Sequence, residues 1–419
     1  MSAVQFYKEE NFKVVEVDGL RLEVPEEWEV VRLGDALVLL RNGLTYRQNK
    51  DGDGYPISRI ETISDEKIDP NKVGFVNNIK LEELKEYRLK TGDILFSHIN
   101  SLEHIGKTAI YEGVPELLLH GMNLLLLRPN RSKIEPYYLL NLLRFYRTQR
   151  IFRNISKKAV NQASINQTQL KNLKIPLPPL QEQQKIAHVL ISIDKAIEAV
   201  DEAIEQAECI KKGLMQELLT KGIGHKEFKD TEIGRIPKEW EVVRLESIVE
   251  IYDSKRIPLS EQERAKKRGP YPYCGATGII DYIDDYIFDG EYLLLAEDGG
   301  YFGPFEQSAY IMSGKFWVNN HAHILRAKDG VSDNWYLMYA LNYMDLRPYI
   351  VGSTRTKLNQ EHMRKIKILL PPLEEQQKIA EILSKWDEVI ELKRAKKERL
   401  GRMKKKIMDL LLTGKVRIK

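Results

Sequence analysis

The chain has 419 residues, of which 42% are hydrophobic and 30% are charged, and its formal net charge is +4. This length is sufficient for two domains that each bury a core. The two cysteines, Cys209 and Cys274, exclude a disulfide framework and a cysteine-based metal site, which fits a reducing compartment. The N-terminus shows no signal region and no apolar run approaches the ~18 residues of a membrane span, so we expect a cytoplasmic protein without a membrane partner.

The placement of charge is more informative than the net charge. Residues 128–174 contain eleven Lys and Arg against one acid, and residues 347–367 contain six against one acid. Residues 281–298 contain seven acids and no Lys or Arg. Such segregation of charge is what a surface that binds a polyanion requires.

An internal repeat organises the chain. IPLPPLQEQQKIAHVLISID at Ile175–Asp194 matches ILLPPLEEQQKIAEILSKWD at Ile368–Asp387, with an offset of 193 residues. PEEWEVVRL at 25–33 matches PKEWEVVRL at 237–245, with an offset of 212 residues. The chain is therefore a tandem duplication whose first copy contains 19 additional residues. The two copies are 12–221 and 228–419.

Each copy has a front part and a back part. The front part mixes turns with short β-rich runs such as Asp93–Ser97 and Tyr292–Leu295, which predicts a globular mixed α/β domain. The back part predicts a long helix. In chain order we predict an N-terminal extension (1–21), a first globular domain (22–175), a first long helix (176–222), a connector (223–235), a second globular domain (236–368) and a second long helix (369–419).

The two long helices are expected to pair with each other. Pro178-Pro179 and Pro371-Pro372 suit helix starts, where a missing N–H is harmless. Apolar residues in 186–218 keep a heptad spacing, so this stripe needs a partner, which the second helix supplies. An antiparallel alignment sets the acidic segment Asp194–Glu208 opposite the basic segment Lys393–Arg399. The charges therefore favour an antiparallel coiled coil.

A duplicated α/β domain in which each copy leads into P-P-L-x-E-Q-Q-K-I-A resembles the specificity subunit of Type I restriction–modification systems. The motif stands at 178–187 and 371–380, and GYPISR at 54–59 and YPYCGATG at 271–278 are further family-like pieces. The resemblance covers nearly the whole chain. It implies a pseudo-two-fold protein with two target recognition domains, separated by the antiparallel helices, that each read one half of a bipartite site in double-stranded DNA.

The resemblance also implies a division of labour. The helices would fix the spacer between the half-sites and dock two adenine methyltransferase subunits, which restriction/translocase subunits then join. The specificity subunit would be non-catalytic and hold no cofactor or metal, because the methyltransferase partner supplies S-adenosylmethionine. Since the two front domains differ in sequence, the half-sites should differ too, which gives an asymmetric target.

Candidate DNA contacts are basic, amide and aromatic side chains in the basic or glycine-rich segments. Arginines recur every three residues in 144–153, which on one helix would form a basic stripe for phosphates or else a solvated face. Asn and Gln side chains after this segment suit base edges, or are turn residues. The predicted contacts are Tyr46, Arg47, Lys50, Arg59, Arg144, Arg147, Arg150, Arg153, Lys157, Asn161 and Gln162 in the first copy and Lys255, Arg256, Tyr273, Arg355 and Lys357 in the second.

Other chemistry finds little support in the sequence. SLEHIGKT at 101–108 has Ser101 where a phosphate-binding loop needs its first glycine. His321-x-His323 has no third metal ligand near it. We find no adenine methyltransferase signature and therefore assign no catalytic residue. The competing hypothesis is a coiled-coil scaffold whose globular ends bind proteins, but such ends need no matched basic segments before each helix.

Overall fold

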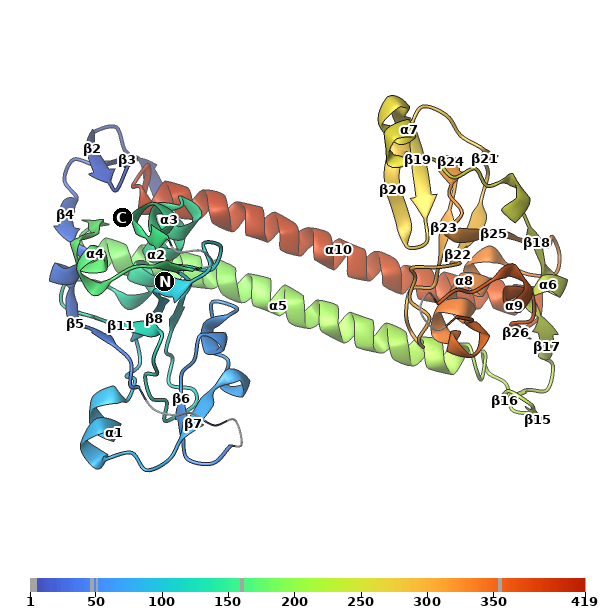
Figure 1. The fold of residues 1–419 in the computed structure, drawn as a ribbon, viewed down its shortest axis with the longest axis horizontal. Helices are drawn as coiled ribbons and strands as arrows, with labels where there is room; N and C mark the ends of the chain where they lie inside the picture. Colours follow the sequence, from blue (N-terminus) through green and yellow to red (C-terminus); the bar gives the residue numbers. More distant parts are fainter. Residues whose placement is uncertain (1–5, 46–48, 50–51, 159–161, 353–355, 419) are drawn as a thin grey trace. The chain divides into compact units, whose positions relative to one another are not determined.

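The structure is a computed structural model that describes residues 6–45, 49, 52–158, 162–352 and 356–418 (Figure 1). The chain divides into two units, of which unit 1 comprises residues 1–199 and 397–419 and unit 2 comprises residues 200–396. Each unit is a mixed α/β body that also contains part of both long helices, α5 (Leu180–Leu218) and α10 (Leu373–Leu412). No helix in the described part of the chain combines the length and apolarity needed to cross a membrane.

The centre of unit 1 is a four-stranded antiparallel sheet in the order β10–β8–β11–β5. The inner strands β8 (Ile94–Ser97) and β11 (Leu124–Pro129) are almost entirely buried, as expected for strands covered on both faces. The outer strands are β10 (Thr108–Ile110) and β5 (Leu37–Asn42). Helix α2 (Pro136–Thr148) packs on this sheet and buries most of its apolar side chains in the same core.

Both ends of the described chain belong to unit 1. Strand β1 pairs with β27, and Val17 of β2 is part of the buried core. The predicted separate N-terminal extension (1–21) is therefore wrong, because its strands complete unit 1. The other elements of unit 1 are β1 (Phe6–Lys8), β2 (Phe12–Val17), β3 (Leu20–Pro25), β4 (Glu29–Arg32), η1 (Leu33–Ala36), β6 (Tyr55–Ile57), η2 (Glu61–Ile63), η3 (Pro70–Lys72), β7 (Gly74–Val76), α1 (Leu81–Tyr87), β9 (Ile99–Asn100), α3 (Ile151–Ile155), β12 (Lys157–Lys158), β13 (Ala163–Ser164), α4 (Gln167–Asn172), β14 (Lys174–Leu177) and β27 (Val416–Ile418).

Unit 2 has its own four-stranded antiparallel sheet in the order β18–β25–β22–β23, whose inner strands are β22 (Tyr292–Ala296) and β25 (Ala322–Ala327). Helix α8 (Asn334–Tyr343) packs on it, and a second sheet has the order β20–β19–β24–β21. The other elements of unit 2 are β15 (Phe228–Thr231), β16 (Gly234–Pro237), β17 (Glu241–Arg244), α6 (Leu245–Ile248), β18 (Val249–Ile251), η4 (Asp253–Lys255), α7 (Glu261–Lys266), β19 (Arg268–Gly275), β20 (Gly278–Ile283), β21 (Phe288–Asp289), β23 (Ala309–Met312), β24 (Lys315–Val318), η5 (Arg347–Tyr349), α9 (Gln360–Arg364) and β26 (Lys367–Leu370).

The predicted boundaries around the long helices need correction. The predicted connector (223–235) contains strand β15 and the beginning of β16, which form a hairpin. The predicted helices (176–222 and 369–419) include strand residues at their edges, because β14 pairs with β4, β26 with β17 and β27 with β1. Both helices begin directly after the second proline of the Pro-Pro pair, four residues later than the predicted bounds of 176 and 369.

The repeated motifs meet in the same way in both units. Trp28 and Trp240 are fully buried, and their indole N–H groups donate to the carboxylates of Glu182 (3.2 Å) and Glu375 (2.9 Å), respectively. Each of these glutamates is the first residue of the Glu-Gln-Gln sequence at the start of its long helix. The conserved pairing of β4 with β14 and of β17 with β26 brings each tryptophan to its glutamate.

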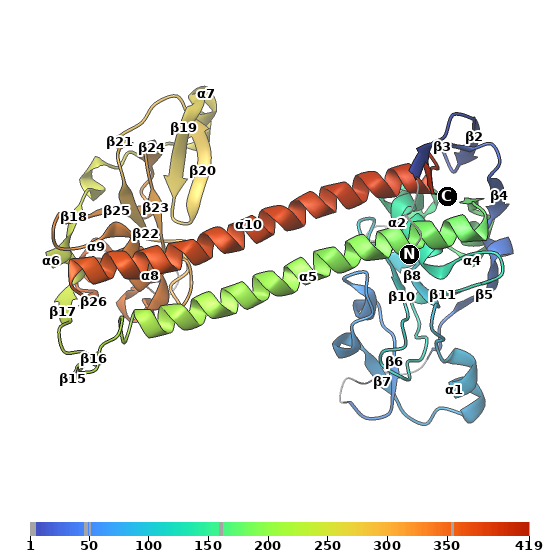
Figure 2. The same cartoon turned by 180° about the vertical axis from the view of Figure 1, so that it is seen from behind.

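Within each unit the two long helices run antiparallel (Figures 1 and 2). In unit 1 Lys404 of α10 pairs with Asp194 of α5 at 2.5 Å. In unit 2 Arg394 pairs with Glu208 at 2.7 Å. The latter pair is the charge match that the sequence predicted, whereas the partner of Asp194 lies beyond the predicted segment 393–399.

Candidate nucleic-acid interface

A short hairpin lies before α5 in unit 1 and before α10 in unit 2, at equivalent positions of the repeat. In unit 1 β12 pairs with β13, and β13 pairs with β9. In unit 2 Val351 and Lys357 exchange two backbone hydrogen bonds of 2.9 Å. The backbone of Lys357 also forms an isolated antiparallel β-bridge with that of Asp298. The two hairpins end 193 residues apart, at Ser164 and Lys357, which is the offset of the repeated helix motif.

Each hairpin is fixed to its unit by a buried apolar residue that follows it. Ile165 and Leu358 are both fully buried. The amide of Ile165 donates to the carbonyl of His98 (2.8 Å), and the amide of Leu358 donates to that of Glu297 (2.7 Å). The predicted contacts Asn161 and Arg355 lie outside the described residues; in the sequence they fall between the paired residues of each hairpin, in the segment that we call its tip. Lys157 and Gln162, at the base of the first tip, are exposed.

The predicted single arginine stripe of unit 1 is wrong. Helix α2 ends at Thr148, and Arg150 has a left-handed backbone (φ 64°) before α3 begins at Ile151. The arginines are therefore divided between two helices. Arg147, Arg150 and Arg153 nevertheless line one pocket of about 240 Å³, and Arg150 is exposed there.

Two of the four arginines are held by one carboxylate. Arg144 and Arg147 both pair with Glu66, which is 29% exposed, and Arg147 also donates to the carbonyl of Glu103 (3.2 Å). These bonds attach the segment around Glu66 to α2. Arg144 and Arg147 thus have structural partners, which leaves Arg150 and Arg153 as the arginines for which the described residues supply no ion pair.

The glycine-rich loop of unit 1 is closely packed at its ends. Gly54 has φ 103°, and a Cβ atom there would lie 2.0 Å from Oδ1 of Asn77, so glycine is required. Arg59 of this loop pairs with Glu61 at 3.3 Å. The predicted contacts Tyr46, Arg47 and Lys50 lie outside the described residues.

In unit 2 two predicted contacts are used inside the protein. Tyr273 is 1% exposed, and its hydroxyl accepts a hydrogen bond from the amide of Leu259 (2.8 Å). Arg256 is mostly buried, pairs with Glu297 and donates to the carbonyl of Ala322 (2.9 Å). The prediction that Tyr273 and Arg256 contact DNA is therefore corrected, because neither side chain faces solvent freely.

Two further predicted contacts of unit 2 are accessible. Lys255 is exposed, with its ammonium 5.0 Å from the ring centroid of Tyr252. Lys357 is 40% exposed and pairs with Glu297 at 2.6 Å. Lys357 therefore stands at the hairpin base with its charge partly compensated.

A buried charged cluster supports the second hairpin. Burial is the largest single influence on Asp253 and opposes its ionisation, but the hydrogen bonds from His323 (2.6 Å) and the amide of Ile324, together with the nearby positive charge of Arg256, lower the pKa of Asp253 overall. Burial likewise opposes ionisation of Glu297, and its bonds to Lys357 and Arg256 lower the pKa of that carboxyl. Nδ1 of His323 faces Asp253 and Nε2 faces the carbonyl of Leu358 (2.7 Å), so a doubly protonated ring satisfies both acceptors.

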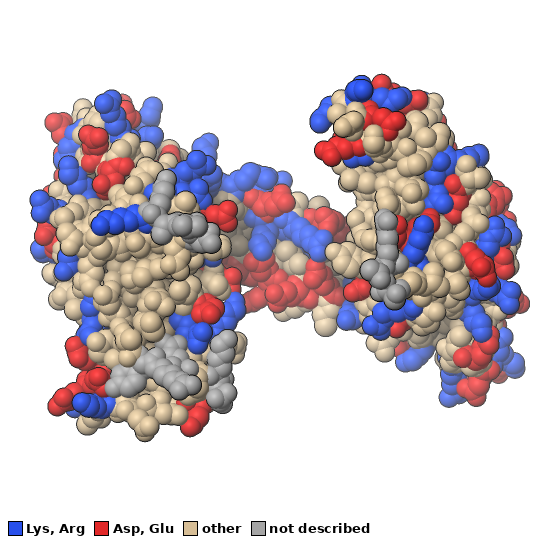
Figure 3. All heavy atoms as spheres, in the orientation of Figure 1, with Lys and Arg blue, Asp and Glu red and all other residues tan. Residues whose placement is uncertain are grey.

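Sequence reasoning missed the acidic partners of this interface. Glu66 and Glu297 are far in the sequence from their arginine and lysine partners, and Asp253 is 70 residues from His323, so no local motif marks these pairings. Among the described residues, no three His, Cys, Asp or Glu side chains are grouped to hold a metal ion. On the face drawn in Figure 3, basic and acidic side chains are intermixed on each unit.

Comparisons with known proteins agree on one family. The family model for the Type I restriction modification DNA specificity domain matches residues 25–208 and 237–402. Two similar proteins come from Methanocaldococcus jannaschii. One carries the name of the type I restriction enzyme MjaX specificity subunit and is 48% identical over 99% of both chains. The type I restriction enzyme MjaVIII specificity subunit is 32% identical over 99% of this chain and 98% of its own length.

Solved structures show the same fold. The crystal structure of a Type-I restriction-modification system S subunit from M. genitalium aligns with a TM-score of 0.60 at 13% identity, over 92% of this chain and 96% of that chain. A chain from a study of the assembly and conformational transition of the type I R-M system aligns with a TM-score of 0.54 at 20% identity, over 93% and 98% of the two chains.

Proposed function

Because the chain belongs to the family of Type I restriction–modification specificity subunits, we propose that its two units read the two halves of one bipartite DNA target. The observation that carries this proposal is the pair of matched hairpins. Each is anchored at the same repeat position, but on a globular part of different sequence. One framework that presents two different surfaces is suited to two non-identical half-sites, and hence to an asymmetric target.

The accessible residues at the hairpins have the chemistry that DNA requires. Lys157, Arg150 and Arg153 of unit 1 and Lys255 and Lys357 of unit 2 would contact phosphates, which fix position without reading sequence. Amide side chains such as those of Asn161 and Gln162 can donate to and accept from base edges in the major groove. We assign base reading to the hairpin tips and positioning to the basic residues beside them.

The chain supplies recognition and leaves the chemistry to partners. Two methyltransferase subunits would bind S-adenosylmethionine and flip an adenine out of each half-site, and restriction/translocase subunits would add DNA cleavage. The two recognition domains would be held apart by α5 and α10 as an antiparallel coiled coil. At ~1.5 Å per residue, helices of this size are about 60 Å long, which suits a device that sets the spacer between the half-sites.

Methylation mapping tests this proposal. The full chain is expressed with its methyltransferase subunit in a host without its own adenine methylation, and methylated adenines are located throughout the genome. We expect every modified adenine to lie in one asymmetric, two-part motif with a spacer of fixed length. Scattered methylation, or none from an assembled complex, would contradict the proposal and would favour a scaffold without DNA specificity.

A further inference from the structure

The part of α10 that belongs to unit 1 carries basic side chains that the candidate interface has not used. Arg402, Lys405 and Lys406 are exposed. Arg402 approaches Glu398 at 3.5 Å, with both side chains more than 70% exposed. Within the described residues, Lys405 and Lys406 have no ion pair. This short stretch of helix therefore presents three cations to solvent with little compensation.

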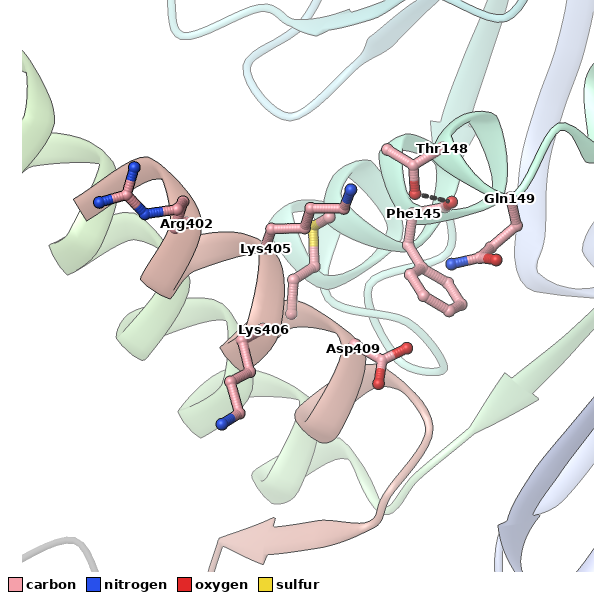
Figure 4. Close-up of a pocket in the computed structure, with 8 residues that line it drawn as sticks. Phe145, Thr148, Gln149, Arg402, Lys405, Lys406 and Asp409 are labelled. Carbon is pink, nitrogen blue, oxygen red and sulfur yellow. Dashed lines mark hydrogen bonds between the residues drawn. The ribbon is translucent and has the colours of Figure 1, made fainter. Parts of the chain in front are cut away.

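These side chains border an open groove between α10 and α2 (Figure 4). The groove has a volume of about 300 Å³, and Phe145 and Met408 form its apolar floor. Thr148, the last residue of α2, and Gln149 directly after it face α10 across the groove, and Asp409 is the one acidic lining residue. The close-up shows Lys405 extending towards the α2 side, whereas Lys406 points away from the other labelled side chains.

The groove adjoins the arginine pocket of the candidate interface. Thr148 lines both pockets, and Arg147, Arg150 and Arg153 line the second one. The α10 cations and two of these arginines, the exposed Arg150 and the half-buried Arg153, therefore line two adjoining pockets on the surface of unit 1. We name this surface, comprising Arg150, Arg153, Arg402, Lys405 and Lys406, the basic band.

The internal repeat shows that the α10 cations are not part of the common framework. The positions 193 residues earlier, on α5, are Cys209, Lys212 and Gly213. Two of the three cations are thus absent from the other copy. Their apolar neighbour Met408, by contrast, corresponds to Met215, and both methionines are 7% exposed in their cores.

The equivalent groove in unit 2 is occupied by the chain itself. The ring of Phe305 packs edge-on against Tyr343 of α8, with centroids 5.1 Å apart. Lys212, the counterpart of Lys405, places its ammonium 4.5 Å from the centroid of Phe305. Unit 2 thus closes a site that unit 1 leaves open and surrounds with positive charge.

This asymmetry indicates what binds the basic band. Two identical methyltransferase subunits on a pseudo-two-fold framework would use positions that both copies share, and the band is not shared. DNA is the polyanion that unit 1 is proposed to hold beside the same arginines. Resting on that proposed function, we infer that Arg402, Lys405 and Lys406 bind DNA phosphates adjacent to the half-site read by unit 1, irrespective of base sequence.

The triple variant Arg402→Gln/Lys405→Gln/Lys406→Gln tests this inference in the full chain assembled with its methyltransferase subunits. Binding to a duplex with the mapped target is measured at several salt concentrations. Log K falls as log salt rises, and each lost phosphate contact reduces the steepness of this fall by about 0.9, so we expect the magnitude of the slope to decrease by about 2–3. Affinities for the target and for a duplex with one altered half-site should fall by the same factor, because phosphate contacts carry no sequence information.

The matched control is Lys226→Gln/Lys229→Gln/Lys238→Gln, which removes the same charge from exposed lysines in and around the β15–β16 hairpin. We expect this control to change the slope by less than half as much. Equal changes in the two variants, or an unchanged slope in the first, would overturn the inference. Loss of assembly with the methyltransferase, measured by size-exclusion chromatography, would also overturn it and assign the band to subunit docking. Failure of the wild-type complex to distinguish target from scrambled DNA would instead refute the proposed function.

Discussion

Two buried glutamines, one in each copy, explain the first glutamine of the repeated Glu-Gln-Gln motif. Gln183 is fully buried, accepts a hydrogen bond from the amide of Glu135 (2.9 Å) and donates to the carbonyls of Lys133 (3.1 Å) and Pro178 (2.8 Å). Gln376 makes the same three kinds of bond in unit 2. Only a side chain with both an acceptor and two donors can do this. The glutamine thus ties the start of each long helix to the helix that covers the central sheet.

We expect Gln183→Ala to lower the free energy of unfolding of unit 1 by about 1–3 kcal/mol, because it leaves buried backbone groups without partners. Urea unfolding gives the free energy, and amide hydrogen exchange assigns the loss to unit 1. The control is Gln184→Ala, at the next, exposed position of the motif, which should change stability by less than about 0.5 kcal/mol. Equal effects of the two substitutions would contradict the role given to Gln183.

At the level of single residues, the sequence did not predict which of the candidate side chains are exposed. Tyr273 and Arg256 have neighbours typical of a DNA-binding loop, but long-range packing buries the tyrosine and Glu297 captures the arginine. Arg144 and Arg147 are likewise bound by Glu66, about 80 residues earlier in the chain. Pairings across such distances depend on the folded core, and no local pattern in one sequence reports them.

At the scale of elements, periodic and repeated features were predictable. The long helices follow from heptad spacing and the Pro-Pro starts, and their antiparallel direction within each unit follows from the charges. The pairing of β1 with β27 was not predictable, because three-residue strands leave little periodic signal and their partners are at opposite ends of the chain. The second hairpin has the same difficulty, since only two backbone bonds define it.

The role of Glu297 in positioning the second hairpin for DNA recognition can be tested. Glu297 binds Lys357 and Arg256 through its side chain and Leu358 through its carbonyl, so it joins the hairpin base to the central sheet. We expect Glu297→Gln to reduce discrimination at the half-site read by unit 2 by about tenfold, which corresponds to ~1.4 kcal/mol. Discrimination at the other half-site should be unchanged.

Competition binding with duplexes altered in one half-site at a time measures both effects. Glu361→Gln is a matched control, because Glu361 pairs with Lys365 at 2.6 Å on the surface of the same unit. Thermal unfolding separates a local effect from loss of unit 2. Equal losses at both half-sites in a folded Glu297→Gln protein would exclude a positioning role for Glu297.

At the scale of the whole molecule, each long helix is followed by a tail that binds the start of the other helix. In unit 1 Arg417, after α10, is 3% exposed and binds Glu182 at the start of α5 (2.6 Å). In unit 2 His225, after α5, contacts Glu375 at the start of α10 (2.8 Å). Each unit therefore contains residues from both repeats, and the start of each long helix is held by a side chain that follows the other helix. This arrangement is suited to setting a length.

A coordinated deletion tests the spacer role. Removing residues 197–203 and 395–401 shortens both helices by one heptad, so the heptad spacing of the apolar stripe on each helix is kept. The deletion retains the pairs Lys404–Asp194 and Arg394–Glu208 and all residues of the hairpins. Seven residues correspond to about 10 Å of helix, or about three base pairs at ~3.4 Å each. Methylation mapping should therefore return the same half-sites with a spacer shorter by about three base pairs.

The result separates length from other determinants of the target. Deleting the heptad from α5 alone should destabilise the chain instead of changing the spacer, because the seam residues of α10 then lose their partners. A double deletion that methylates the original motif would show that the partner subunits, and not these helices, set the distance. Altered half-sites with an unchanged spacer would show that the helices act on the recognition surfaces. Unaltered half-sites with a shorter spacer require that recognition and spacing are separate properties of this chain.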